Sequence, residues 1–201
     1  MSGVILLSTA YLPPSGYFAL FINSDDIVIE GWETFHKQTY RNRTYLLSAH
    51  GVQLLTVPVF EGSRHNTPIK DIRIDYTKRW QQVHLGSLTA SYRSSPFFEF
   101  YFEVIEKIIK KNHIFLLDLN SELLIAVCDI LKIKEYPSLT GSFISPGEQE
   151  YDFRYTLSPK ISTSYRTKEY MRVFETGNQI DPRISILDLI FNTGPDAINY
   201  L

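Results

Sequence analysis

The 201-residue chain contains one cysteine, Cys128, so it cannot form an intramolecular disulfide. A chain without disulfides fits a reducing compartment. It also lacks any apolar run of the roughly 18 residues that would cross a bilayer. Residues 1–7 carry no basic n-region, and Pro13 follows too early for a signal peptide. These absences predict a cytoplasmic protein without a transmembrane segment.

Neither sign of charge dominates the sequence: 20 Lys and Arg stand against 22 Asp and Glu, for a net charge of −2. No global positive field therefore attracts nucleic acid, although this balance leaves room for a local basic patch. The sequence also lacks the CxxC, HExxH, GxSxG, GxxxxGK and GxGxxG motifs, and its five histidines show no ligand spacing. We therefore expect no bound metal, and no particular cofactor is indicated.

The length suits one large domain, or one domain with a modest appendage. Hydrophobic residues make up 44% of the sequence and aromatic residues 14%, and the hydrophobic share is ordinary for a soluble globular protein. Apolar runs over residues 4–8 and 27–29 predict buried strands, and residues 17–22 predict a short helix between them. This strand–loop–helix–strand order is typical of an α/β layer. The predicted fold class is α/β, with a mixed sheet, a helical middle and a less regular C-terminal part.

Two more apolar runs, over residues 44–47 and 52–59, flank His50-Gly51 and predict a β-hairpin. The imperfect alternation of residues 69–74 predicts another strand. Three helices are expected next: one capped by Thr77, one from Phe97 to about Lys110, and one after Asn120.

The composition changes after residue 134, where Pro, Gly, Ser, Thr and Tyr replace most of the apolar residues. We therefore divide the chain into an α/β core domain, residues 1–134, and an irregular extension, residues 135–201. Ser185 to Asp188 form a capping-box pattern, which predicts a short C-terminal helix that packs on the core.

The densest polar cluster is residues 36–43, between two predicted strands. Arg41, Arg43 and Lys37 suit the binding of a phosphate or carboxylate, and an arginine can bind such a group with two hydrogen bonds. His36 suits acid–base chemistry near neutral pH. The alternative interpretation is a solvated basic turn.

A second cluster combines Trp80 and His84, which share one helix face at a spacing of four, with Tyr92. The N-terminus of the next helix at Ser95-Pro96 offers backbone N–H groups to an anion. A buried core histidine is the alternative interpretation of His84. The turn from Tyr11 to Tyr17 follows the first strand, where α/β units often bind ligands.

These segments, in this order, resemble the WbqC-like protein family over roughly residues 4 to 131. The resembling motifs are Tyr11-Leu12-Pro13, Gly16-Tyr17-Phe18, Asp26-Ile27-Val28-Ile29, Lys37, Asn42-Arg43, Leu55-Thr56-Val57-Pro58-Val59, and Trp80, His84 and Tyr92 with Ser95-Pro96-Phe97-Phe98. The closing segment around Ser185-Ile186-Leu187-Asp188 resembles Bacteroidetes-type members. Many members carry an acidic stretch ahead of the lysine, where this sequence has only Glu33.

The resemblance implies a bacterial role in surface-polysaccharide (O-antigen) biosynthesis, and a glycine transferase role is proposed for some members. We predict a transferase that joins glycine or another amine to a small-molecule or sugar-linked carboxylate. A nucleotidyl or acyl-adenylate transferase and a non-catalytic assembly or glycan-binding protein are the alternatives.

In this hypothesis Arg41 and Arg43 hold the anionic group and Asn42 positions it. His84 or His36 takes the amine proton, and Lys37 neutralises developing charge. The predicted catalytic residues are His84, His36 and Lys37, and the predicted substrate-binding residues are Tyr11, Tyr17, Arg41, Asn42, Arg43, Trp80 and Tyr92. The mechanism requires the segment near residue 40 and His84 to face a common cleft.

Overall fold

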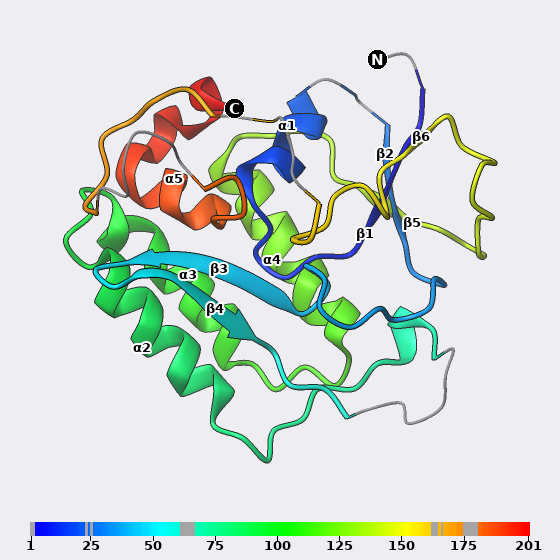
Figure 1. Ribbon diagram of the computed structural model, residues 1–201, viewed down its shortest axis with the longest axis horizontal. Helices are drawn as coiled ribbons and strands as arrows, with labels where there is room; N and C mark the ends of the chain where they lie inside the picture. Colours follow the sequence, from blue (N-terminus) through cyan, green and yellow to red (C-terminus); the bar gives the residue numbers. More distant parts are fainter. Residues whose placement is uncertain are drawn as a thin grey trace.

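The structure is a computed structural model that describes residues 3–22, 24, 26–60, 67–161, 165, 167–174 and 181–201. Within these ranges five α-helices accompany a parallel sheet and a separate antiparallel strand pair (Figure 1). The predicted α/β fold class is confirmed. In the same ranges, no helix combines the length and apolar character needed to cross a bilayer.

The parallel sheet has the strand order β5-β2-β1-β6. Its central strands are β1 (Ile5–Ser8) and β2 (Ile27–Glu30), and its short outer strands are β5 (Ser138–Leu139) and β6 (Tyr151–Asp152). β1 pairs in parallel with both β2 and β6, and β2 pairs in parallel with β5. The apolar run in β1 is almost completely buried, as expected for a central parallel strand.

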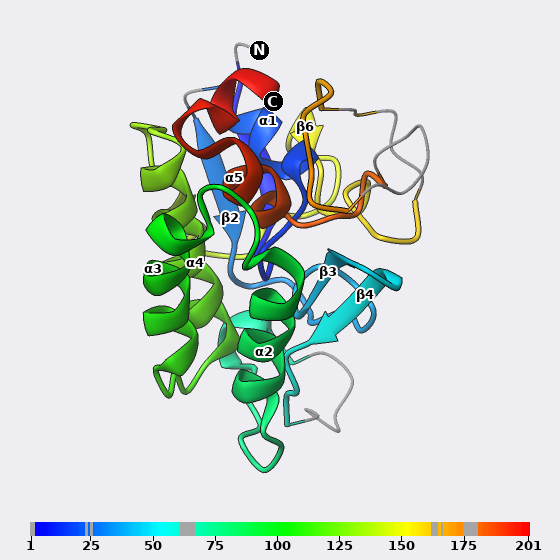
Figure 2. The ribbon, with the colours of Figure 1, turned by 90° about the vertical axis from the view of Figure 1, so that its left-hand side faces the viewer.

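Helix α1 (Ser15–Ile22) connects β1 to β2, as the sequence predicted. Helices α3 (Phe98–Lys110) and α4 (Leu116–Ile130) pack side by side (Figure 2). α3 buries Phe98, Ile105 and Ile109 on one face, which is the spacing of an amphipathic helix. α5 (Ile186–Thr193) is almost entirely buried and contacts both α1 and α3.

The predicted hairpin is present as β3 (Arg43–Ser48) and β4 (Gly51–Thr56), with Arg43 opposite Thr56. Gly51 supplies the positive φ of 99° that the turn needs. Helix α2 (Trp80–Tyr92) packs against β3. In both views the hairpin and α2 lie toward the opposite end of the molecule from β6 and the N-terminus (Figures 1 and 2).

The strand predicted over residues 69–74 is wrong. Ile69–Asp71 forms a 3-10 helix, in which the Ile72 N–H donates to the Ile69 carbonyl. Only single bridges follow, between Val59 and Ile74 and between Arg73 and Phe115. Ile69 and Ile72 both point into the core because a spacing of three matches a 3-10 turn, in which side chains at i and i+3 eclipse.

Two predicted helix starts also need correction. Thr77 does not cap α2, because its hydroxyl donates to Asp75 Oδ1 and the helix begins at Trp80. α4 begins at Leu116, before Asn120, because the apolar residues preceding Asn120 are already buried against the core.

The C-terminal part supplies β5 and β6 to the sheet as well as α5. Ser185 is the N-cap of α5, as predicted, and its Oγ accepts a hydrogen bond from the Leu187 N–H. The division after residue 134 stays a prediction.

Candidate functional site

A cleft of about 840 Å³ lies between the hairpin and the start of α2. Three segments that are separate in the sequence form its walls: the loop before β3, the end of β4 with the residues after it, and the first turns of α2 with the residues before it. Its lining residues are Phe35, Lys37, Gln38, Asn42, Arg43, Leu54, Leu55, Thr56, Pro58, Val59, Phe60, Asp75, Lys78, Arg79, Trp80, Val83 and His84. Its volume falls in the range of small-molecule sites.

The cleft is positively charged although the chain as a whole carries a net charge of −2. Among the described residues, four cationic side chains line it, namely Lys37, Arg43, Lys78 and Arg79, against one acid, Asp75. Hydrogen bonds from the hydroxyl and the backbone N–H of Thr77 hold the pKa of the Asp75 carboxyl below its usual range. The field inside this cleft therefore favours an anionic ligand.

His84 lies in the wall of the cleft and is only 2% exposed. Its Nε2 is 3.2 Å from the Thr56 carbonyl oxygen and its Nδ1 is 2.8 Å from the Tyr11 hydroxyl oxygen. A carbonyl oxygen can only accept, so Nε2 carries the proton and Nδ1 accepts from Tyr11. Burial lowers the pKa of His84 to about 4, which keeps the imidazole neutral at pH 7.

Trp80 stands one helical turn before His84, with the two ring centroids 5.1 Å apart. The ring of Tyr11 packs edge-on against Trp80, and its centroid is 5.5 Å from that of His84. Tyr11, Trp80 and His84 thus form one aromatic group beneath the cleft, and two of its members reach the lining.

Buried polar atoms without hydrogen-bond partners gather along this wall. Asn42 Nδ2 donates to the Val57 carbonyl at 2.9 Å, which fixes the amide, but Asn42 Oδ1 has no partner among the residues that the structure describes. The same holds for Arg43 Nε and Trp80 Nε1. Leaving a buried polar atom without a partner costs about 1–3 kcal/mol, so a ligand that forms hydrogen bonds to these three atoms would recover that cost.

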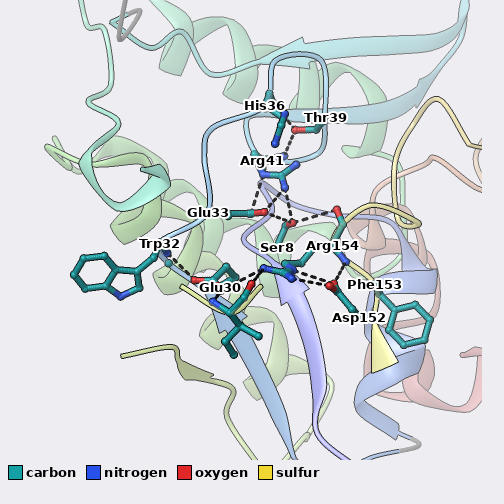
Figure 3. Close-up of polar contacts among 12 residues, drawn as sticks. Ser8, Glu30, Trp32, Glu33, His36, Thr39, Arg41, Asp152, Phe153 and Arg154 are labelled. Carbon is teal, nitrogen blue, oxygen red and sulfur yellow. Dashed lines mark hydrogen bonds and ion pairs between the residues drawn. The ribbon is translucent and has the colours of Figure 1, made fainter. Parts of the chain in front are cut away.

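Arg41 lies outside the cleft, although it is only two residues from Arg43. Its side chain donates to both carboxylate oxygens of Glu33 and, at 2.7 Å, to Ser8 Oγ (Figure 3). Arg41 and Glu33 are 3% and 1% exposed. The Asn120 side chain also donates to the Arg41 carbonyl at 2.8 Å, so this residue is held at both its side chain and its backbone.

A second buried ion-pair group lies beside the first, at the carboxyl ends of β2 and β6 (Figure 3). Arg154 binds Glu30 and Asp152, and it donates to the Ile144 carbonyl at 2.8 Å. The Ser8 hydroxyl at the end of β1 lies 3.3 Å from the Arg154 carbonyl and so connects the two groups. The carboxyl edge of the sheet, a common ligand position in α/β folds, is therefore filled by paired charges.

The other predicted site residues lie away from the cleft. The Tyr17 hydroxyl donates to the Ser8 carbonyl at 2.9 Å, and the cavity beside it has a volume of only about 10 Å³. The Tyr92 hydroxyl accepts from the Leu47 N–H at 3.1 Å inside the core. His36 is exposed, does not line the cleft, and packs edge-on against Tyr155. Partial burial, with a smaller effect from Arg41, lowers the pKa of His36.

The structure thus brings Lys37, Asn42, Arg43, Trp80 and His84 together in one cleft. Sequence reasoning missed Lys78 and Arg79, although they stand immediately before Trp80 in the sequence. It also missed the apolar lining residues, because nothing in the sequence separates them from core residues. In the described ranges no three His, Cys, Asp or Glu side chains are grouped so that they could hold a metal ion.

Comparison with known proteins places the chain in a family. It is 27% identical over 227 aligned positions to the uncharacterized protein Rv1507c of Mycobacterium tuberculosis, an alignment that covers 100% of this chain and 98% of that protein. No solved structure matches it. The sequence model of the "WbqC-like protein family" matches residues 9–172, so the segment near Ser185 lies outside the match. Because most of the chain is matched, and in agreement with the resemblance of its motifs, this protein belongs to the WbqC-like protein family.

Proposed function

We propose that this protein is a transferase of bacterial surface-polysaccharide (O-antigen) assembly and that its cleft holds the anionic group of a sugar-linked substrate. One observation carries the proposal. Lys37, Asn42, Arg43, Trp80 and His84, which carry the family resemblance, come from separate segments and line one cationic cleft. The association of the family with O-antigen assembly, as the resemblance implies it, supplies the biological setting.

The cationic residues have distinct roles in this proposal. The guanidinium of Arg43 binds the substrate carboxylate or phosphate with two hydrogen bonds, and Lys37 adds a point charge. Lys78 and Arg79 attract the anion from the opposite wall. Arg41 does not touch the substrate in our proposal, because its side chain is already bound to Glu33 and Ser8. It instead holds Asn42 and Arg43 in place.

The proposed reaction joins the amine of glycine, or a similar amine, to an activated sugar carboxyl group. The nitrogen–carbon bond forms as the bond from the carboxyl carbon to a phosphate leaving group breaks, and Lys37 and Arg43 stabilise the departing phosphate, which takes the bonding electrons. The amine proton passes to solvent at the open mouth of the cleft. His84 supports the cleft wall rather than taking this proton, because both of its ring nitrogens are already hydrogen-bonded.

Binding tests the first part of the proposal. Isothermal titration calorimetry with UDP-glucuronic acid, a nucleotide sugar that carries a carboxylate, is expected to show binding to the unaltered protein. Arg43→Ala and Lys37→Ala each remove a charge-assisted hydrogen bond, so each is expected to weaken binding by roughly tenfold or more. Lys107→Ala, in an exposed ion pair on α3, is the matched control. Equal affinity in Arg43→Ala and the control would contradict an anion site in this cleft.

A second candidate, a non-catalytic glycan-binding or assembly protein, is favoured by one observation: the histidine in the cleft is neutral and has both nitrogens bonded. Labelled glycine separates the two. Transfer of the label to an activated sugar carboxyl that depends on Arg43 supports the transferase. Ligand binding without transfer, together with loss of surface polysaccharide in cells that carry Arg43→Ala, supports the non-catalytic role.

A further inference from the structure

Three apolar side chains in the cleft are largely exposed to solvent. Leu54 is 44% exposed, Phe60 53% and Val83 57%. Scattered exposed apolar residues are normal on a protein surface, but here they lie in one cleft together with four cations. A purely hydrophilic ligand would leave this apolar surface in water.

The apolar residues stand next to cations on both walls. Arg79 is the N-cap of α2, and its carbonyl accepts a hydrogen bond from the Val83 N–H, so the two residues are neighbours at the start of the helix. On the hairpin, Arg43 lies opposite Thr56, and Leu54 is two residues from Thr56, so Arg43 and Leu54 point to the same face. Val52, which is 41% exposed, extends this apolar face along β4. Each wall of the cleft thus carries a cationic side chain next to an exposed aliphatic side chain.

We propose that the ligand of this cleft is an amphiphilic anion, a phosphate ester of a long-chain alcohol such as an isoprenoid. The phosphate lies between Arg43 and Arg79, and the hydrocarbon chain lies across Leu54 and Val83. The inference rests on the proposed function, because it names the carrier to which the sugar-linked anion is attached. Exposed aliphatic side chains beside the cations on both walls favour a hydrocarbon chain, whereas a nucleobase would stack on Phe60, the exposed aromatic ring of the same cleft.

Three probes test this inference by calorimetry: inorganic phosphate, geranyl phosphate below its aggregation concentration, and uridine monophosphate. Geranyl phosphate is expected to bind at least roughly tenfold tighter than inorganic phosphate, the effect of burying about two methylene groups. In the Leu54→Ser/Val83→Ser double variant, the ratio of these two dissociation constants is expected to fall toward one. Phe100→Ser, at a 73% exposed position on α3, is the control and should keep the ratio.

The outcomes separate this inference from the proposed function. If inorganic phosphate binds but geranyl phosphate binds no tighter, the lipid carrier is refuted and the anion site stands. If uridine monophosphate binds tighter than geranyl phosphate, the ligand is a nucleotide and the carrier is also refuted. If none of the three probes binds, both the anion site and the inference fall.

Discussion

The buried ion pair between Arg41 and Glu33 leads to the most quantitative prediction. Both side chains are almost fully buried, and the Arg41 side chain makes three hydrogen bonds to Glu33 and Ser8. Glu33→Gln keeps the shape of the side chain but leaves the guanidinium charge buried without its counterion. Removing one partner of a buried pair costs about 3–5 kcal/mol, because the remaining charge keeps its desolvation penalty.

This loss is large compared with the about 5–15 kcal/mol that separates the folded from the unfolded state of a typical domain. Urea denaturation followed by circular dichroism measures this loss of stability. We expect a lower transition midpoint and an unchanged dependence of the unfolding free energy on urea concentration. The matched control is Glu103→Gln, which breaks an ion pair whose side chains are 70% and 68% exposed. We expect no measurable change in the midpoint of that variant, because exposed pairs are screened by water.

A double variant separates charge burial from general damage to the core. Glu33→Met/Arg41→Met removes both charges, and exchanging a buried pair for apolar side chains is often neutral. It is therefore expected to unfold at a higher urea concentration than Glu33→Gln. Two results would contradict this account of the ion pair. Glu33→Gln could unfold at the same urea concentration as the unaltered protein, or the double variant could unfold at a lower urea concentration than Glu33→Gln.

Three further predictions concern other buried groups. The pKa of His84 falls from 6.5 to about 4 on folding, so the unfolded chain binds more protons than the folded protein below pH 6.5. The free energy of unfolding should therefore drop by about 3 kcal/mol from pH 7 to pH 4. A plot of the urea midpoint against pH measures this drop, and His84→Gln should make that plot flatter. Burial raises the pKa of the Cys128 thiol to about 12, so iodoacetamide at pH 8 should label it only in denaturant, and labelling of the folded protein would show that the thiol is accessible. Gly194 has a φ of 60°, and an added Cβ would clash with the Phe97 ring, so Gly194→Ala should lower the urea midpoint by an amount corresponding to about 1–3 kcal/mol. Gly86 has open space around it, so Gly86→Ala should not lower the midpoint.

Local patterns predicted the elements whose signal lies within one stretch of sequence. The hairpin followed from two apolar runs around Gly51, and the N-cap of α5 followed from Ser185. The strand predicted at residues 69–74 was wrong because it, too, was inferred from local apolar spacing alone. Its apolar spacing fits a 3-10 turn about as well as a short strand, and only tertiary contacts decide between them.

Pairing over long distances in the sequence was not predictable. β6 contributes two residues to the sheet, and their partners in β1 lie about 146 positions earlier. Tyr151 favours a strand but Asp152 does not, and two residues are too few for a strand pattern; the ion pairs of Arg154 with Glu30 and Asp152 connect β6 to β2. The polar, irregular composition after residue 134 concealed the segment that completes the sheet.

The candidate site shows the same limit at the level of single side chains. Arg41 and Arg43 look equivalent in the sequence, and both were predicted to bind the substrate. In the structure the chain turns between them, and Arg41 enters the core beside Glu33 while Arg43 begins β3 and lines the cleft. The acid that neutralises Arg41 is eight residues away, and no local pattern shows which of the two arginines it binds.

This difference between two neighbouring arginines makes the site testable without a known substrate. A charge that is already paired in the core contributes to stability, whereas a charge that faces an open cleft contributes to ligand binding. Arg41→Ala should therefore lower the urea midpoint strongly, and Arg43→Ala should lower anion affinity with a smaller effect on the midpoint. If the two variants instead behave alike in both measurements, the separation of a supporting arginine from a binding arginine is wrong, and the anion site with it.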